Sequence, residues 1–374
     1  MSYETDRSAE AVPMEPAPAA SPQNIRATAQ KSAKLLIVDD SRLLRKGLRK
    51  LFEADPKIEI VGEADNGRMA LAYLPRLNPD VITLDINMPE MDGLTTLKHI
   101  MIKHPTPTVM LSSLTREGAT KSFDALRLGA IDFITKPSQR DPENFAGQAT
   151  AICQKIRQAS EVEIKNIRLF RSQPPLSKAT HPTLIKHCIV LGASEGGYRP
   201  LLKIIPQLKP EWTAAYLVVL HVDPEYVDAF VDYLDDYSQI PVNRAVDGSL
   251  IEGGCCYLAA GSDYITAIRD GNRLMLRVHP SPFPGRRGAI NMLMFSLSEA
   301  LGNRTIGVIL SGRGNDGAEG AAEIKRVGGN IIIQSPATCM FREMPQAVIR
   351  LSGSAQIMPD VNIAETIGNI CLEP

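Results

Sequence analysis

The sequence predicts two consecutive α/β domains, each built on a largely parallel β-sheet. Short apolar runs alternate with stretches of helical spacing, which is the pattern of strands that are buried on both faces and joined by crossover helices. The pattern stops near residue 136 and begins again at residue 186. A chain of 374 residues is also long enough for two domains that each bury a core.

The first pattern predicts a doubly wound, five-stranded parallel sheet within residues 34–150. The expected strands are 35–39, 58–63, 80–85, 107–112 and 131–135, and the expected helices lie near 41–53, 67–77, 92–103 and 117–128. Residues 1–33 hold four prolines and eight alanines. They lack the charged segment followed by an apolar segment that an export signal has, so we expect a disordered tail.

The second pattern predicts another α/β domain over residues 184–374, and its spacing favours a mostly parallel sheet. The expected strands are 187–191, 215–220, 256–259, 306–310 and 330–334, and the expected helices are 197–205, 225–236, 289–301 and 317–327. Residues 151–183 are predicted to be a linker. They begin with helical apolar spacing and end in a polar segment that contains two prolines.

Composition argues against several classes of protein. The formal net charge is −1, whereas a dedicated nucleic-acid binder normally has a strongly basic face. No apolar run is long enough to span a membrane. The six cysteines are scattered without a CxxC pair, which favours free thiols in a reducing cytosol over a metal site or disulfides. We therefore expect a soluble, cytoplasmic protein that binds no nucleic acid and is not embedded in a membrane.

Polar residues end several of the predicted strands in the first domain. Asp39 and Asp40 close the first strand, and Asp85 closes the third. Ser112 ends the fourth strand, and Lys136 follows the fifth. The carboxyl ends of parallel strands gather at one edge of a sheet, so we expect these side chains to converge. Three carboxylates are tolerated together only if a cation lies among them.

This edge predicts a magnesium site beside an acceptor for a phosphoryl group. Asp85 can become an acyl phosphate, and Mg²⁺ held by Asp39 and Asp40 would offset the charge on the transferring oxygens. Lys136 can pair with the phosphoryl group, and Ser112 can donate a hydroxyl to it. Each residue alone could be an ordinary polar strand end, but the five together in this order favour function.

Residues 34–140 resemble the response-regulator receiver domain. The resemblance rests on Val38-Asp39-Asp40-Ser41, on the segment 85–93 and on Lys136-Pro137. It implies that Asp85 is the phosphoacceptor and that Phe133 acts with Ser112 and Lys136 as a switch residue. The expected Mg²⁺ ligands are Asp39, Asp40, Asp85 and Asn87.

In the second domain, Ser194 lies on a glycine-rich turn between a predicted strand and a predicted helix. The turn reads Gly192-Ala193-Ser194-Glu195-Gly196-Gly197, and its small residues would let a substrate approach the serine oxygen. Amides at the start of the helix could bind an oxyanion. Phosphate-binding loops look similar, so the turn alone does not identify a nucleophile.

Two further residues lie at equivalent strand ends. His221 follows the apolar run 214–220, and Asp316 lies between a strand and a helix. Alone, His221 could be a core histidine and Asp316 a helix N-cap. Together with Ser194 they supply a nucleophile, a base and an orienting acid. Their order differs from the Ser, Asp, His order of α/β-hydrolases, so that fold is not implied.

The chain from about residue 34 to 370 resembles the chemotaxis protein-glutamate methylesterase family. Further matching stretches are 247–248, 257–262, 334–339 and 344–345. The resemblance implies hydrolysis of glutamate methyl esters on chemoreceptors, often with deamidation of receptor glutamines, and it requires no cofactor for the ester hydrolysis. It also implies a chemotaxis histidine kinase as phosphodonor. The unphosphorylated receiver would cover the active site, and phosphorylation of Asp85 would relieve the block.

Four positions depart from this family's pattern. Glu195 stands where a small neutral residue is usual, and Arg313 stands where methionine is usual. We hypothesise that these two opposite charges pair across the mouth of the pocket. Ala289 and Asn291 replace a serine and an aspartate, a change that could affect substrate contacts or loop support.

These departures keep an alternative function open, a phospho-switched binding protein whose esterase domain has weakened turnover. A transcriptional response regulator would fit the first domain only. The second domain shows neither a compact helix-turn-helix pattern nor a basic surface.

Overall fold

The computed structural model describes residues 32–113, 115–136, 142–164, 184–222, 224–271, 273–280, 288–353 and 355–372. The predicted tail, except its last two residues, lies outside this part of the chain, as does most of the predicted linker. All the described residues belong to one compact unit. Within the described residues, no helix combines the length and apolar character that crossing a bilayer requires.

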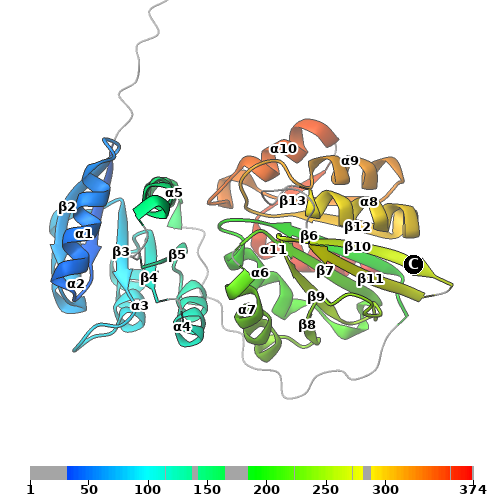
Figure 1. Ribbon diagram of the computed structural model, residues 1–374, viewed down its shortest axis with the longest axis horizontal. Coiled ribbons are helices and arrows are strands. Elements are labelled where there is room, and N and C mark those ends of the chain that lie inside the picture. Colours follow the sequence, from blue (N-terminus) through cyan, green and yellow to red (C-terminus); the bar gives the residue numbers. More distant parts are fainter. Residues whose placement is uncertain are drawn as a thin grey trace, which may run out of the picture. The chain divides into compact units, whose positions relative to one another are not determined.

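The first domain is the predicted five-stranded parallel sheet, with strand order β2-β1-β3-β4-β5 (Figure 1). The strands are β1 (Ala33–Val38), β2 (Ile58–Ala64), β3 (Val81–Asp85), β4 (Thr108–Ser112) and β5 (Asp132–Thr135). The helices are α1 (Arg42–Glu53), α2 (Gly67–Leu77), α3 (Gly93–Lys103), α4 (Arg116–Arg127) and α5 (Pro142–Ser160).

Local chemistry sets where these helices begin. The side chains of Ser41, Asn66, Asp92 and Thr115 each accept a hydrogen bond from a backbone amide in the first turn of the helix that follows. Such N-caps satisfy amides that have no partner within the helix. Apolar residues of α1 and α5 pack on one face of the sheet, and those of α2, α3 and α4 pack on the other. The domain is therefore doubly wound.

The predicted domain boundary after residue 150 is wrong. Helix α5 continues without a break to Ser160. Ile152, Cys153 and Ile156 are buried in the same apolar cluster as Leu35 of β1. Residues 151–160 therefore belong to the first domain, because their apolar side chains complete its core.

The second domain has the predicted mostly parallel sheet, with strand order β14-β13-β12-β6-β7-β9-β8 and parallel pairing throughout. Its strands are β6 (His187–Ala193), β7 (Ala214–Leu220), β8 (Val242–Arg244), β9 (Cys256–Ala260), β12 (Thr305–Ile309), β13 (Asn330–Gln334) and β14 (Gln356–Met358). An antiparallel pair, β10 (Asp263–Asp270) and β11 (Arg273–Pro280), was not predicted.

Helices cover both faces of this second sheet (Figure 1). Helices α6 (Tyr198–Ile204), α7 (Pro224–Tyr237) and α11 (Asp360–Leu372) pack on one face. Helices α8 (Ala289–Leu301), α9 (Ala318–Arg326) and α10 (Glu343–Ser352) pack on the other, together with β10 and β11. Short 3-10 turns cover Ile205–Gln207, Pro210–Trp212, Gly302–Arg304 and Pro336–Thr338.

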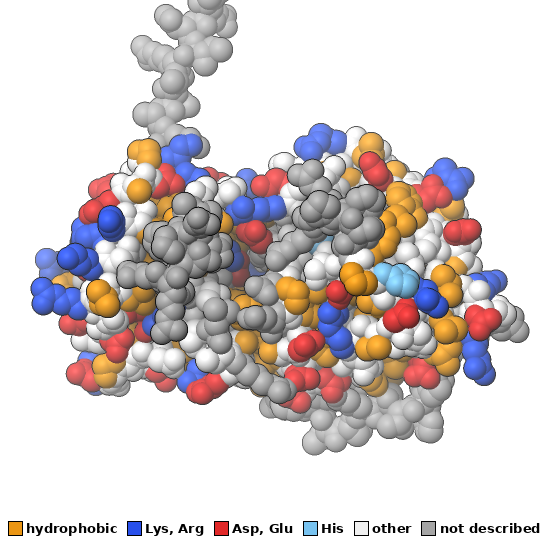
Figure 2. Space-filling view, in the orientation of Figure 1, with side chains coloured by type: hydrophobic (Ala, Val, Ile, Leu, Met, Phe, Trp, Pro, Cys, Tyr) orange, Lys and Arg blue, Asp and Glu red, His pale blue; other side chains and the backbone are white. Residues whose placement is uncertain are grey.

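The surface of the described residues mixes both signs of charge. Figure 2 shows acidic and basic side chains interspersed over the face in view. All six cysteines are free, and all but Cys255 are buried.

Candidate functional site

The carboxyl end of the first sheet carries a cluster of three carboxylates. Asp39 directly follows β1 and Asp85 ends β3, and these strands are neighbours with Val38 opposite Leu84. One carboxylate oxygen from each of Asp39, Asp40 and Asp85 lies within 4.8 Å of the others. Asp39 and Asp85 are buried, and Asp40 is exposed. The strand order thus brings together acids that are far apart in the sequence, as predicted.

Lys136 provides a positive charge to this cluster. Its Nζ lies 2.7 Å from Asp85 Oδ2 and 3.2 Å from Asp39 Oδ2. Burial raises the pKa of Asp85, and the charge of Asp39 adds to this effect, while Lys136 opposes both. Partial burial opposes the charge of Lys136, but the two carboxylates outweigh it and raise the lysine's pKa. Lys136 therefore forms ion pairs with both buried carboxylates.

The donor set fits a divalent cation. Asp39 Oδ2 and Asp85 Oδ2 have no hydrogen-bond partner among the described residues, although Lys136 lies within ion-pairing distance of both. Carboxylate oxygens without hydrogen bonds are the hard ligands that Mg²⁺ prefers. The backbone N–H of Asn87, the fourth predicted ligand, donates to Asp85 Oδ1 at 3.3 Å, and the Asn87 side-chain oxygen accepts from Lys121 Nζ at 3.1 Å.

Ser112, at the end of β4, and Phe133, in β5, make contacts with other residues. The Ser112 hydroxyl donates to the Gly118 carbonyl at 3.1 Å and accepts from the Ser122 hydroxyl at 2.8 Å. Both partners are on α4, so the hydroxyl is tied to that helix. Phe133 is buried, and its ring lies 5.2 Å from that of Tyr198 in the second domain.

The turn that carries Ser194 is held by its backbone. Ser194 directly follows β6, and its amide donates to the Ser311 carbonyl at 3.1 Å. Its carbonyl accepts from the Gly197 amide at 2.8 Å. Gly196 has a φ of 74°, a conformation that favours glycine. The serine therefore lies at the carboxyl end of the second sheet, as its position in the sequence predicted.

A buried polar network supports the same turn. The Ser311 amide donates to Gln334 Oε1 at 2.9 Å, and the Ser311 hydroxyl contacts the Glu195 carbonyl at 3.3 Å. Gln334 in turn donates to the Thr338 carbonyl at 3.1 Å. Ser311 and Gln334 are almost fully buried. Sequence reasoning did not assign them this role, although Gln334 starts one of the stretches that match the family.

His221 and Asp316 meet at the amino end of α8. His221 Nε2 lies 2.7 Å from Asp316 Oδ2. The Asp316 carboxylate also accepts from the amides of Ile290 and Asn291, each at 3.0 Å. Burial alone would raise the pKa of Asp316, but the hydrogen bond and charge of His221 and the two amides outweigh burial and lower it. The acid is therefore ionised at neutral pH and fixes the orientation of the imidazole.

The Ser194 hydroxyl does not hydrogen-bond to the His221 ring, its predicted base. The hydroxyl instead donates to the backbone carbonyl of His221 at 3.4 Å. Within the described part of the chain, His221 Nδ1 is buried and has no hydrogen-bond partner. The structure thus brings the three predicted residues together, with the serine beside the histidine and one ring nitrogen uncommitted. Such bonds often form only when substrate binds.

Glu195 and Arg313 form the ion pair that the sequence predicted. Arg313 Nε lies 3.0 Å from Glu195 Oε2. The guanidinium carbon lies 4.5 Å from the centre of the Phe341 ring, so the arginine stacks on a buried aromatic face. The pair sits next to Ser194 and cancels the charge that Glu195 alone would place beside a developing oxyanion.

Asn291 supports a loop. Its side-chain oxygen accepts from the Gly320 amide at 2.8 Å, which links α8 to α9. Its backbone N–H donates to Asp316 Oδ1. Of the two consequences proposed for this departure, the contacts favour loop support. The neighbouring residues 281–287 lie outside the described part of the chain.

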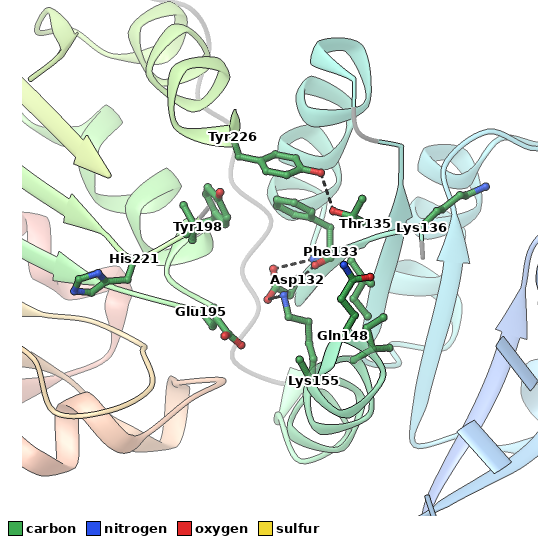
Figure 3. Close-up of a pocket in the computed structure, with 15 residues that line it drawn as sticks. Asp132, Phe133, Thr135, Lys136, Gln148, Lys155, Glu195, Tyr198, His221 and Tyr226 are labelled. Atoms are coloured by element: carbon green, nitrogen blue, oxygen red, sulfur yellow. Dashed lines mark hydrogen bonds and ion pairs between the residues drawn. The ribbon is translucent and has the colours of Figure 1, made fainter. Parts of the chain in front are cut away.

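A cavity of about 360 Å³ adjoins His221 and is lined by residues of both domains (Figure 3). The first domain contributes Asp132, Phe133, Ile134, Thr135, Lys136, Gln148, Ala151, Ile152 and Lys155, and the second contributes Glu195, Gly196, Tyr198, His221, Val222 and Tyr226. Across it, the Thr135 and Tyr226 hydroxyls are 2.9 Å apart. The β5 and α5 region of the first domain therefore faces the turn that carries Ser194.

Sequence reasoning missed the residues that join the two domains. Tyr233 donates to Asp124 of α4 at 2.6 Å, and Arg127 donates to Tyr233 at 3.3 Å. The Phe123 ring packs within 4.9 Å of the Phe230 ring. Four of the nine tyrosines in the chain lie in α7 or at the first residue of α6, but aromatic residues on a helix normally indicate packing in the domain's own core.

Comparison with known proteins places both domains in described families. A family model described as CheB methylesterase matches residues 189–367, and one described as the response regulator receiver domain matches residues 35–143. A protein-glutamate methylesterase/protein-glutamine glutaminase of Pyrococcus abyssi is 36% identical over 344 residues, covering 90% of this chain and 93% of that protein. The protein of the same description from Archaeoglobus fulgidus is 37% identical, covering 89% and 97%. The crystal structure of the Thermotoga maritima CheB methylesterase catalytic domain is 29% identical with a TM-score of 0.47, covering 49% of this chain and 98% of that one.

Proposed function

This chain belongs to the CheB methylesterase family, and on that premise we propose that it is a phosphorylation-activated protein-glutamate methylesterase of chemotaxis. Its substrates are glutamate methyl esters on chemoreceptors, and its phosphodonor is a chemotaxis histidine kinase. The names of the relatives extend the proposal to deamidation of receptor glutamines. The six free cysteines agree with a cytoplasmic site of action.

The His221–Asp316 contact beside Ser194 carries the catalytic proposal. Because Asp316 is ionised and lies 2.7 Å from Nε2, the imidazole proton is on Nε2 and Nδ1 has the free lone pair. Nδ1 is also the nitrogen without a partner. We therefore assign the base to Nδ1, which takes the Ser194 proton after the hydroxyl leaves the His221 carbonyl.

The reaction then follows acyl transfer. Ser194 Oγ bonds to the ester carbonyl carbon while its proton passes to His221, and backbone amides at the start of α6 stabilise the oxyanion. The C–O bond to the methoxy group breaks, and His221 returns the proton to give methanol. Water attacks the acyl-enzyme with His221 again as base, releasing the glutamate side chain and restoring the serine. This hydrolysis uses no cofactor.

Asp85 is the proposed phosphoacceptor, with Mg²⁺ held by Asp39, Asp40, Asp85 and Asn87. The ion would supply positive charge to the transferring phosphoryl oxygens. Lys136 would move from Asp39 and Asp85 to the phosphoryl group, and Ser112 would leave α4 to donate its hydroxyl. These movements act at the carboxyl ends of β4 and β5.

The contacts of β5 support the regulatory part of the proposal. Thr135 directly precedes Lys136 and hydrogen-bonds Tyr226, while Phe133 packs against Tyr198. A shift of Lys136 therefore strains contacts that hold β5 next to the active site. The unphosphorylated receiver restricts access to Ser194, and phosphorylation relieves the restriction.

Methanol release from a methylated receptor tests the proposal. Wild type should release methanol, and a small phosphodonor with Mg²⁺ should increase the rate. Ser194→Ala should abolish release, and Asp85→Asn should keep the low rate whether or not the donor is present. Equal background release by wild type and Ser194→Ala would instead favour a binding protein without turnover. A donor without effect on wild type would refute the regulation but not the catalysis.

A further inference from the structure

Arg313 has hydrogen-bonding capacity that the described residues leave unused. Its Nε and Nη2 atoms are buried and have no hydrogen-bond partner in the described part of the chain. Glu195 Oε2 is 3.0 Å from Nε, but the N–H group is not directed at it, so the contact is an ion pair without a hydrogen bond. Buried donors without acceptors are costly and rare in native proteins.

The unsatisfied atoms form one edge of the guanidinium group. Nε and Nη2 lie side by side, and their N–H bonds are spaced to donate to both oxygens of one carboxylate. The guanidinium lies over the Phe341 ring, with its central carbon 4.5 Å from the ring centre, and this contact limits its movement. This edge is covered in the structure, and its two parallel donors would be satisfied by a carboxylate that takes the place of Glu195 with better geometry.

This edge lies close to the proposed nucleophile. Arg313 follows Gly312, and a Cβ atom at residue 312 would be only 2.8 Å from Ser194 Cβ. Glu195 follows Ser194 in the chain and lines the cavity beside His221. A ligand bound to Arg313 would therefore be held next to the reacting ester.

We propose that Arg313 is a specificity-determining residue that binds a carboxylate side chain of the substrate next to the glutamyl ester. Glu195 forms an ion pair with Arg313 but accepts no hydrogen bond from it, and the substrate carboxylate displaces Glu195. The preferred substrate is thus an acidic segment in which a second carboxylate neighbours the methylated glutamate. The inference rests on the proposed methylesterase function.

The selectivity between two substrates tests this inference. The probes are two methylated receptor cytoplasmic fragments that differ only next to the ester, one with glutamates and one with alanines. The full-length protein is assayed with phosphodonor and Mg²⁺, and the ratio of kcat/KM for the two fragments is measured. Arg313→Met should lower this ratio about tenfold, the effect of losing one charge-assisted hydrogen-bonded pair. Arg313→Lys, which keeps the charge but not the two-donor edge, should recover only part of it.

A matched control separates this site from general charge. Arg277 forms an exposed ion pair with Asp247, with Nε 3.2 Å from Oδ1, and Arg277→Met should leave the ratio at its wild-type value. Glu195→Gln should raise the ratio, because it removes the competing carboxylate. An unchanged ratio in Arg313→Met, or an equal fall in Arg277→Met, overturns the inference.

Binding provides a readout that does not depend on turnover. Fluorescence anisotropy measures the affinity of the same two fragments for Ser194→Ala protein with and without Arg313→Met. The ratio of the two affinities should again fall about tenfold. If wild type releases no methanol but this ratio falls, the esterase proposal fails and the carboxylate site stands. If methanol is released but neither ratio changes, the site fails and the esterase stands.

Discussion

Replacing Gly261 by alanine tests whether the position of the His221 ring sets the rate. Gly261 directly follows β9, beside the end of β7, and its φ is not among the positive values, so alanine suits its backbone. A Cβ atom at residue 261 would lie 1.7 Å from His221 Nδ1, 2.4 Å from Cγ and 2.7 Å from Cα. Rotation of the ring could relieve the first two contacts. The third is with backbone and requires one of the two segments to move.

The size of the displacement gives the expected loss. Non-bonded carbon atoms need about 3.5–4.0 Å of separation, so the ring must move by more than about 1 Å. A misplacement of about 1 Å can cost on the order of 10²-fold in rate. The movement would also break the 2.7 Å contact between His221 and Asp316. We therefore expect kcat to fall by at least about 10²-fold.

The assay is methanol release from methylated receptor at matched concentrations of folded protein, with phosphodonor and Mg²⁺. Gly248→Ala is the control, because Gly248 has a φ of 78° but nothing within 4 Å of its Cβ position. This variant should lose stability through backbone strain yet keep its kcat within about twofold. Wild-type kcat in Gly261→Ala, or an equal loss in Gly248→Ala, would refute the reasoning.

Three further predictions rest on specific contacts. Burial raises the pKa of Asp316, but the hydrogen bond and charge of His221 and the nearby backbone amides outweigh burial and lower it. The ionised carboxylate therefore stabilises the fold fully at pH values above the ordinary pKa of 3.8. This stabilisation is lost as the pH falls through the lowered pKa of the folded state. In denaturant unfolding, the advantage of wild type over Asp316→Asn should therefore be constant near neutral pH and shrink only below about pH 4; an advantage that shrinks near neutral pH would contradict the shift. Tyr226→Phe removes the 2.9 Å hydrogen bond with Thr135, which is worth about 0.5–1.5 kcal/mol, so methanol release without phosphodonor should rise about 2- to 12-fold. Thr135→Val removes the same hydrogen bond and should give the same rise. No rise in either variant would show that this contact does not help the receiver to cover the active site. Gln334→Leu leaves the buried Ser311 amide without its acceptor and should cost about 1–3 kcal/mol in urea unfolding. Gln346→Leu, on the exposed face of α10, should cost much less, and equal losses in the two variants would contradict the role of this hydrogen bond.

The predicted fold was most accurate where elements are buried. Strand β13 and helix α8 begin and end at the predicted residues, because the three isoleucines of β13 and most of the apolar side chains of α8 are buried in the core. The missed strands β8 and β14 have only three residues each and lie at the two edges of the sheet. The antiparallel pair β10 and β11 has one exposed face and several charged residues, which weakens the strand signal. Helices α10 and α11 were also not predicted.

The site was predicted in its members but not in all its contacts. Asp39, Asp40, Asp85 and Lys136 converge as expected, because a parallel sheet places successive strand ends at one edge. The same rule brought Ser194, His221 and Asp316 together. It did not predict that Ser194 contacts the His221 carbonyl or that Ser112 is tied to α4, since a hydroxyl rotates towards whichever acceptor its surroundings offer.

The sequence by itself determined that there are two parallel-sheet domains, which family the chain belongs to, and which polar residues lie at the carboxyl end of each sheet. Apolar runs and the polar residues that end them are local properties of the chain. Only the tertiary structure decided which imidazole nitrogen of His221 contacts Asp316, which nitrogens of Arg313 lack hydrogen-bond acceptors, and that Thr135 contacts Tyr226. Those features depend on side-chain directions across segments that are distant in the chain, and such directions are set by packing rather than by sequence spacing.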